Sequence, residues 1–346
     1  MAPTSKSRAQ PPYLTKDAFP KHFASSSIRQ VTYSDPTAAR ISSQNSSIRS
    51  IAWNSASTLV ATGGPDRTLR VWNPERNNVR NSTELKGHAA MIETVAFNPA
   101  KEGELCSVSP DGVAKFWDVR TRTCINEVKG LGGAFTLTWH SNGQSLVVGN
   151  KEDVLHVLSP SQPTPISSHP QGKQTNQIAF CWSGSKIFAT TGPDGKTRIL
   201  DYPSFDPKYR LNYFPEDDPR TEFTLNGHTS SCLSVALQPT GRYLATGGSD
   251  AVISLWDTAD WICQRTITTI AGPVRSISFT HEGSYVAGGS EEGSGIEVHH
   301  VETGDLVHAF KTAGPSPIVS WAPTKYVLAY TDLSVLRTVG LESSQK

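Results

Sequence analysis

Histidine, serine or threonine, and aspartate occur together twice in this 346-residue chain, and these are the residue types of a hydrolytic triad. The first set, closed by a tryptophan, comprises His88, Ser107, Asp111 and Trp117. The second set keeps the same order and comprises His228, Thr246, Asp250 and Trp256. In a triad the histidine activates the hydroxyl for attack on a carbonyl. Two copies in one chain, each placed under an indole, favour instead two buried structural tetrads that hold a repeated unit together.

Other residues that could do chemistry form no catalytic or metal-binding pattern. The five cysteines are odd in number and include no pair at metal-ligand spacing, so we expect reduced thiols that pack as small hydrophobic side chains. The sequence also lacks a nucleotide-binding glycine loop and a carboxylate pair suited to a cleft. It therefore predicts a protein that is not an enzyme and that has no cofactor, no metal and no small-molecule substrate.

The elements that carry the two tetrads belong to a repeat. Seven aromatic or apolar anchors each close a short β-branched run: Trp53, Phe97, Trp139, Phe180, Leu237, Phe279 and Trp321. They are 44, 42, 41, 57, 42 and 42 residues apart, which is the period of a four-stranded propeller blade. Three copies continue through a turn aspartate to a tryptophan, as WD repeats do. The sequence therefore predicts an all-β, seven-bladed WD-repeat β-propeller.

The propeller is expected to span residues 38–340, after a flexible basic N-terminal arm at 1–37 and before a C-terminal tail at 341–346. The seventh repeat has three strands of its own, and an open blade edge promotes aggregation. We therefore expect an N-terminal strand at residues 38–43 to supply the fourth strand and close the ring. A Pro-rich acidic loop at 203–222 lengthens the interval after the fourth anchor and is expected to leave the ring as a surface excursion.

The charge of the chain is nearly balanced, with 32 basic and 31 acidic residues and a formal net charge of +1. The chain as a whole therefore has no general attraction for nucleic acid. Residues 1–46 carry six basic and two acidic side chains, scattered among Ser, Pro and Thr, which is typical of a solvated tail and leaves an indirect or weak RNA contact open. A run of 18 apolar residues and a signal peptide are both absent, so we expect a soluble protein without membrane attachment.

One position in each repeat is a candidate for partner binding. The residue four places before each anchor is expected at the mouth of the ring, with its side chain directed to solvent. These residues are Arg49, Glu93, Phe135, Asn176, Leu233, Arg275 and Pro317. Aromatic and arginine side chains on a polar rim are typical anchors of protein interfaces. We place the centre of this candidate face at Phe135, Leu233 and Arg275.

Several stretches are more specific than the repeat. They occur at residues 117–121 (Trp-Asp-Val-Arg-Thr), 148–154 (Val-Gly-Asn-Lys-Glu-Asp-Val), 202–203 (Tyr-Pro), 273–279 (Pro-Val-Arg-Ser-Ile-Ser-Phe) and 301–305 (Val-Glu-Thr-Gly-Asp). Together they resemble the THO complex subunit 3 family, the WD-repeat members of the TREX mRNA export assembly. The resemblance implies a non-catalytic nuclear scaffold that links transcription to mRNA packaging and export. It also implies large helical THO subunits as partners and, through them, an RNA helicase and an export adaptor.

Two alternatives stay open at this point. The Trp-Asp-Val-Arg stretch from Trp117 to Arg120 matches the box by which substrate receptors resemble one another in docking to cullin-type ubiquitin ligases. The same four residues end an ordinary third strand in many propellers. An enzyme would need polar side chains that converge on the central channel, whereas the inner strands read Ile-Ala-Trp, Val-Ala-Phe and Ile-Ser-Phe.

Overall fold

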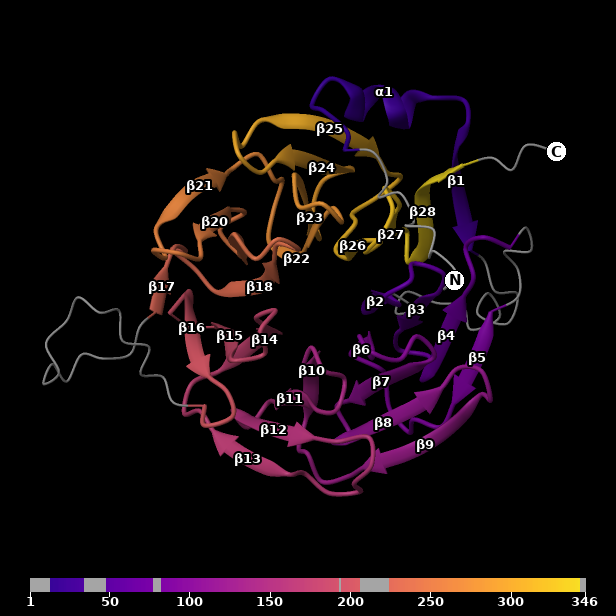
Figure 1. Ribbon diagram of the computed structural model, residues 1–346, viewed down its shortest axis with the longest axis vertical. Helices are drawn as coiled ribbons and strands as arrows, with labels where there is room; N and C mark the ends of the chain where they lie inside the picture. The colour runs from indigo at the N-terminus through magenta and orange to yellow at the C-terminus, as the bar shows by residue number, and fades with distance from the viewer. Residues whose placement is uncertain (1–12, 34–47, 77–81, 193, 206–223, 343–346) are drawn as a thin grey trace, which may run out of the picture.

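A computed structural model describes residues 13–33, 48–76, 82–192, 194–205 and 224–342. The chain forms seven four-stranded antiparallel sheets arranged as blades around a central channel (Figure 1). This confirms the predicted seven-bladed all-β propeller. The described residues include one short helix, α1 (Ala18–Ala24), which precedes the ring in the sequence.

The strands follow one order in each of the first six blades, from the channel outward. Blade 1 contains β2 (Ser50–Trp53), β3 (Val60–Gly63), β4 (Thr68–Trp72) and β5 (Thr83–Lys86). Blade 2 contains β6 (Thr94–Phe97), β7 (Glu104–Ser109), β8 (Val113–Asp118) and β9 (Thr123–Val128). Blade 3 contains β10 (Ala134–Trp139), β11 (Leu146–Asn150), β12 (Val154–Leu158) and β13 (Ser167–Pro170).

The second half of the ring repeats this order. Blade 4 contains β14 (Thr175–Phe180), β15 (Lys186–Thr191), β16 (Lys196–Asp201) and β17 (Thr224–Asn226). Blade 5 contains β18 (Cys232–Leu237), β19 (Tyr243–Gly248), β20 (Ile253–Asp257) and β21 (Cys263–Ile267). Blade 6 contains β22 (Val274–Phe279), β23 (Tyr285–Ser290), β24 (Gly295–His300) and β25 (Leu306–Lys311).

Blade 7 closes the ring with strands from both ends of the chain. It contains β26 (Val319–Trp321), β27 (Leu328–Asp332) and β28 (Val335–Glu342), and β1 (Ile28–Tyr33) pairs antiparallel with β28 as its outer strand. An N-terminal strand therefore closes the ring, as predicted, but it is not the predicted segment at 38–43, which lies outside the described residues. β1 reads Ile-Arg-Gln-Val-Thr-Tyr, with three β-branched residues, and it buries Val31 and Tyr33 against the blade.

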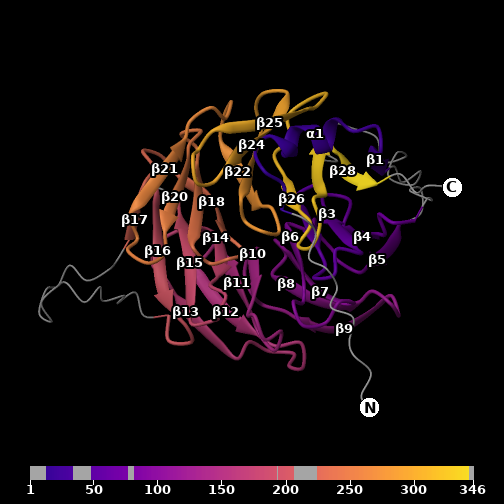
Figure 2. The same ribbon diagram turned by 45° about the horizontal axis from the view of Figure 1, so that its top comes forward.

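The predicted boundary of a flexible arm at residue 37 also needs correction, because residues 13–33 contain both α1 and β1. Helix α1 lies across the outside of blades 6 and 7, beside β25 (Figures 1 and 2). Phe19 has no exposed surface and packs against Tyr285, Trp321 and Tyr326. The helix is thus fixed by an aromatic socket that two neighbouring blades build together.

The hydrophobic core is divided among the seams between blades. In the seam of blades 2 and 3, for example, Phe116 and Val128 pack with Leu137 and Trp139. Each blade buries one face of its sheet against the next, so the inner strands and the turns at their ends are held at fixed positions. The functional side chains therefore sit on a rigid frame.

Candidate protein-interaction site

The second tetrad is assembled as a complete hydrogen-bond chain in blade 5. The loop between β17 and β18 places His228 under the turn that follows β19. His228 Nδ1 lies 3.1 Å from Asp250 Oδ1, and Nε2 lies 2.8 Å from Thr246 Oγ1. The indole of Trp256 donates to the same threonine hydroxyl over 2.9 Å. Because a carboxylate can only accept, the imidazole donates from Nδ1 to Asp250, and Nε2 is the atom that pairs with the Thr246 hydroxyl.

The first tetrad is only partly assembled in blade 2. His88 Nε2 lies 2.7 Å from Ser107 Oγ, which also accepts the Trp117 indole N–H over 2.8 Å. Asp111 is exposed and accepts from Val113 N instead, while His88 Nδ1 is buried without a hydrogen-bond partner among the described residues. Burial lowers the pKa of His88 to about 4, so the imidazole is neutral near pH 7.

Neither arrangement is suited to nucleophilic catalysis. The hydroxyls of Ser107 and Thr246 are completely buried, and each already accepts an indole N–H. A substrate carbonyl could not approach them without displacing the tryptophan. The two sets therefore hold the strands and turns of blades 2 and 5 together by buried hydrogen bonds.

Blades without a full tetrad use other polar contacts at the same turn. In blade 1, the Trp72 indole donates to Thr62 Oγ1 over 3.4 Å, and Asp66 forms an ion pair with Arg70. The residue that replaces the histidine there, Gln44, lies outside the described residues. In blade 3, the side chain of Asn150 donates to Leu131 O over 2.7 Å and accepts two backbone N–H groups. The Asn150 side chain thus holds the Gly-Asn-Lys-Glu-Asp turn at residues 149–153 in place.

The seven candidate partner-binding residues lie where the inner strands begin, at one mouth of the channel. In four consecutive blades the candidate residue is the extra residue of a β-bulge, because the pairing register shifts across it. These bulged residues are Phe135 in β10, Asn176 in β14, Leu233 in β18 and Arg275 in β22. In blades 1 and 2 the candidate residue also shares an opposite residue with the next one along, since Arg49 N donates to Gly63 O over 2.8 Å and Glu93 N donates to Val108 O over 3.0 Å, opposite Ser50 and Thr94. A bulge redirects a side chain and increases local twist.

Five of these seven residues are less exposed than predicted. Arg49 and Arg275 are exposed, and Arg275 lies 3.1 Å from Glu291. The other five are half-buried and comprise Glu93, Phe135, Asn176, Leu233 and Pro317.

Hydrogen bonds between blades fix the backbone of this mouth. Thr94 Oγ1 donates to Phe135 O over 2.6 Å, and Asn176 Nδ2 donates to Cys232 O over 2.7 Å. Ser276 Oγ donates to Pro317 O over 2.9 Å. A surface held in this way loses little conformational entropy when a partner binds.

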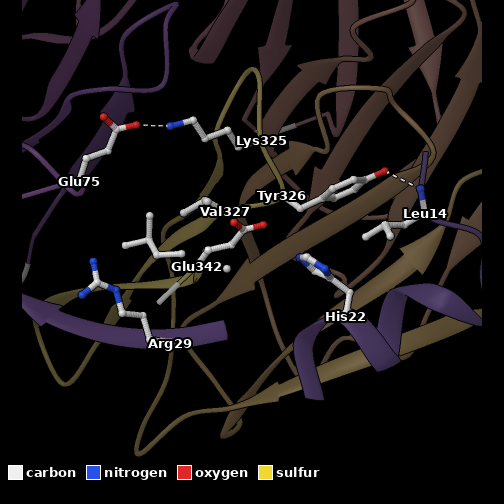
Figure 3. A pocket seen from close by; sticks show the side chains of 10 residues that line it. Leu14, His22, Arg29, Glu75, Lys325, Tyr326, Val327 and Glu342 are labelled. Atoms are coloured by element: carbon white, nitrogen blue, oxygen red, sulfur yellow. Dashed lines mark hydrogen bonds and ion pairs between the residues drawn. The ribbon is translucent and has the colours of Figure 1, made fainter. Parts of the chain in front are cut away.

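A cavity of about 550 Å³ lies beneath α1 (Figure 3). Two carboxylates and two cationic side chains line it, namely Glu75, Glu342, Arg29 and Lys325. Lys325 is paired with Glu75, and Tyr326 accepts from Leu14 N over 3.1 Å. Its charges balance, so the lining does not select an anionic or a cationic ligand. We describe it as the space left where the N-terminal segment crosses blade 7.

The remaining sequence predictions concern metals, membranes and the ligase box. Among the described residues, no group of three metal-ligating side chains is present, and no helix is long and apolar enough to cross a membrane. In the Trp-Asp-Val-Arg box, Trp117 is buried in its tetrad, whereas the Arg120 side chain is 87% exposed. The tryptophan of the box is thus accounted for by the blade itself.

Comparisons with known proteins agree with this architecture. The family described as "WD domain, G-beta repeat" matches residues 37–73, 80–118 and 220–257. The solved Cps50 (Swd1) β-propeller domain of Myceliophteria thermophila superposes with a TM-score of 0.71 at 16% identity, covering 87% of this chain and 98% of that one. The fold and the repeated tetrads define a seven-bladed WD-repeat propeller.

Two curated relatives cover most of the chain. THO complex subunit 3 of Arabidopsis thaliana is 34% identical over 309 residues, which are 86% of this chain and 93% of that protein. WD repeat-containing protein AAC3 of Dictyostelium discoideum is 31% identical over 301 residues, which are 81% of this chain and 60% of that protein. The chain belongs to the THO complex subunit 3 family, which confirms the resemblance found in the sequence.

Proposed function

We propose that this protein is a nuclear, non-catalytic scaffold subunit of a THO complex, and that it helps to couple transcription to mRNA packaging and export. The identity with THO complex subunit 3 along nearly the whole of both chains supports membership. The buried tetrads support a structural role for the residues that resembled a triad. Its partners are larger helical THO subunits and, through them, an RNA helicase and an export adaptor.

The observation that carries the docking part of this proposal is the row of bulged residues that blades 3–6 present at the mouth of the ring. Phe135, Leu233 and Arg275 occupy three of the four bulged positions. Apolar and arginine side chains on a fixed backbone suit a protein interface, in which a few buried anchors supply most of the affinity. We assign to this mouth at least part of the contact with a larger THO subunit.

The double variant Phe135→Asp with Arg275→Glu tests this contact. It is expected to abolish co-purification of the larger subunit, because it places two carboxylates where apolar and cationic groups meet the partner. The matched control carries the same two kinds of change on the outer strand of blade 2 and in the turn before it, Ile125→Asp with Arg122→Glu. Ile125 is 50% exposed, and this control should bind as the wild type does. Retained binding by a correctly folded mouth variant would exclude this face.

A further inference from the structure

The face opposite the bulged mouth is formed by the turns that follow the inner strands. Neighbouring turns are linked across blade seams by small polar side chains. Three of these links join Asn98 to Gly143, Gln238 to Gly283 and Ser57 to Thr324, at 2.9, 2.6 and 3.0 Å. Asn98, Gln238 and Ser57 are at most 5% exposed. The ring thus fastens these turns with amides and hydroxyls that are hidden from solvent.

The seam between blades 4 and 5 makes the same kind of link with a much larger side chain. Trp182 follows β14, and its indole N–H donates to Gln238 O over 2.7 Å. The ring lies against Gly241, where a Cβ would come within 3.3 Å of Trp182 Cδ1. Yet 56% of Trp182 is exposed. In the other seams an amide or a hydroxyl is enough to make this hydrogen bond. Most of the indole surface of Trp182 is therefore not needed for the link between the two blades.

The indole of Trp182 is already held in one orientation in the absence of a partner, as a preorganised interface anchor is. Its hydrogen bond fixes the ring before any partner arrives, so little rotamer entropy is lost on binding. Tryptophan, with tyrosine and arginine, is enriched among the dominant contacts of protein interfaces. The exposed part of Trp182 can offer only apolar ring surface, because its single donor is already used.

The charges around Trp182 favour protein over nucleic acid as the occupant. Lys186 lies 2.6 Å from Asp201, and Arg242 lies 2.7 Å from Glu302. Lys186, four residues after Trp182, and Arg242, which follows the glycine that the indole contacts, are therefore both paired with carboxylates of the same chain. Single-stranded RNA binds where stacking aromatics are combined with cations available to the phosphates. A neutral surface with one rigid indole instead fits an apolar, uncharged pocket of a protein.

We propose that Trp182 anchors a second docking surface, which seats in an apolar, uncharged pocket of another THO subunit. This inference rests on the proposed function. Asn176 at the mouth lies about 13 Å from Phe180 at the other end of β14, since a strand rises about 3.3 Å per residue, and Trp182 follows in the turn beyond Phe180. The two faces can therefore hold two chains at once, and the ring acts as a bridge between them.

The test uses the full-length chain co-expressed with the other THO subunits. Trp182→Gln keeps an amide donor for Gln238 O, as in the neighbouring seams, but removes the indole surface. We expect it to lose one subunit from the complex, or to weaken that subunit at least tenfold in a binding titration, with an unchanged melting temperature. Trp182→Phe restores an aromatic ring and should recover most of the affinity. Ile166→Gln, at a site that is 53% exposed on the outside of blade 3, should behave as the wild type.

The outcomes separate this inference from the function on which it rests. If the wild-type ring recovers no THO subunit, both are overturned. If the wild type recovers them and Trp182→Gln binds within twofold of it, only the second docking surface is overturned. Trp182-dependent binding of a fluorescent single-stranded RNA, or a Trp182-dependent dimer of the isolated ring, would also overturn the assignment to a THO subunit.

Discussion

The two tetrads provide a matched test of how hydrogen bonds stabilise the blades. His228 makes two side-chain hydrogen bonds within its tetrad, whereas His88 makes one and leaves Nδ1 unpaired among the described residues. His228→Ala would remove a charge-assisted bond to Asp250 and leave the buried Thr246 hydroxyl without an acceptor. His88→Ala would remove one neutral bond together with an unpaired nitrogen.

The structure sets the expected sizes. The loss of a bond to a charged group costs about 1.5–3 kcal/mol, and an unpaired buried hydroxyl costs about 1–3 kcal/mol. Asp250 keeps the bond from Thr229 N at 2.9 Å, which limits its own loss. We therefore expect His228→Ala to lower the free energy of unfolding by about 3–4 kcal/mol and His88→Ala by about 1–2 kcal/mol.

Urea unfolding followed by tryptophan fluorescence measures both values, provided that the slope of each transition is unchanged. The two aspartates supply the control. Asp250→Ala should be clearly destabilising, whereas Asp111→Ala should cost less than about 1 kcal/mol because Asp111 is exposed and forms no hydrogen bond with His88. Equal losses for the two histidine variants, or for the two aspartate variants, would refute the assigned difference between the blades.

Two further predictions follow from the same structure. Burial lowers the pKa of His88 from 6.5 to about 4 in the folded chain. Between pH 6.5 and pH 4 the histidine therefore binds a proton in the unfolded chain but not in the folded chain. Stability should therefore fall as the pH drops from 6.5 to 4, and His88→Gln should flatten that fall in urea midpoints measured across this range. Deletion of residues 1–26 removes Phe19 from its socket and should lower the melting temperature, and deletion of 1–33 should also cause aggregation because it exposes the edge of β28. Equal behaviour of the two truncations in light scattering would show that β1 does not protect that edge.

The ring itself could be predicted because the same sequence pattern recurs in every blade. Each blade buries the same kinds of side chain, so the anchor spacing alone gave the number of blades and their strand order. The closing strand occurs once, and proximity to the first inner strand suggested residues 38–43. The segment that closes the ring, Ile28–Tyr33, has the stronger β-branched pattern but is separated from β2 by residues 34–49. Loop length is a weak constraint, so proximity in sequence was a poor guide.

Other features depend on contacts that one sequence does not reveal. The helix around Phe19 is stabilised by Tyr285 and Trp321, which lie more than 250 residues away. The bulges at the mouth are shifts in strand register, and they change the exposure of side chains such as Leu233 without any signal in the local pattern. Trp182 was missed because it stands two residues after an anchor, outside the repeat positions that were compared.

Affinity purification of the tagged full-length chain from nuclear extract, with quantitative identification of the bound proteins, tests the central claim most directly. Membership of a THO complex predicts recovery of the large helical THO subunits in amounts similar to the tagged chain, and their loss with Phe135→Asp and Arg275→Glu. Recovery of a cullin-ligase adaptor without THO subunits would contradict the account and support the role suggested by the Trp117 to Arg120 box.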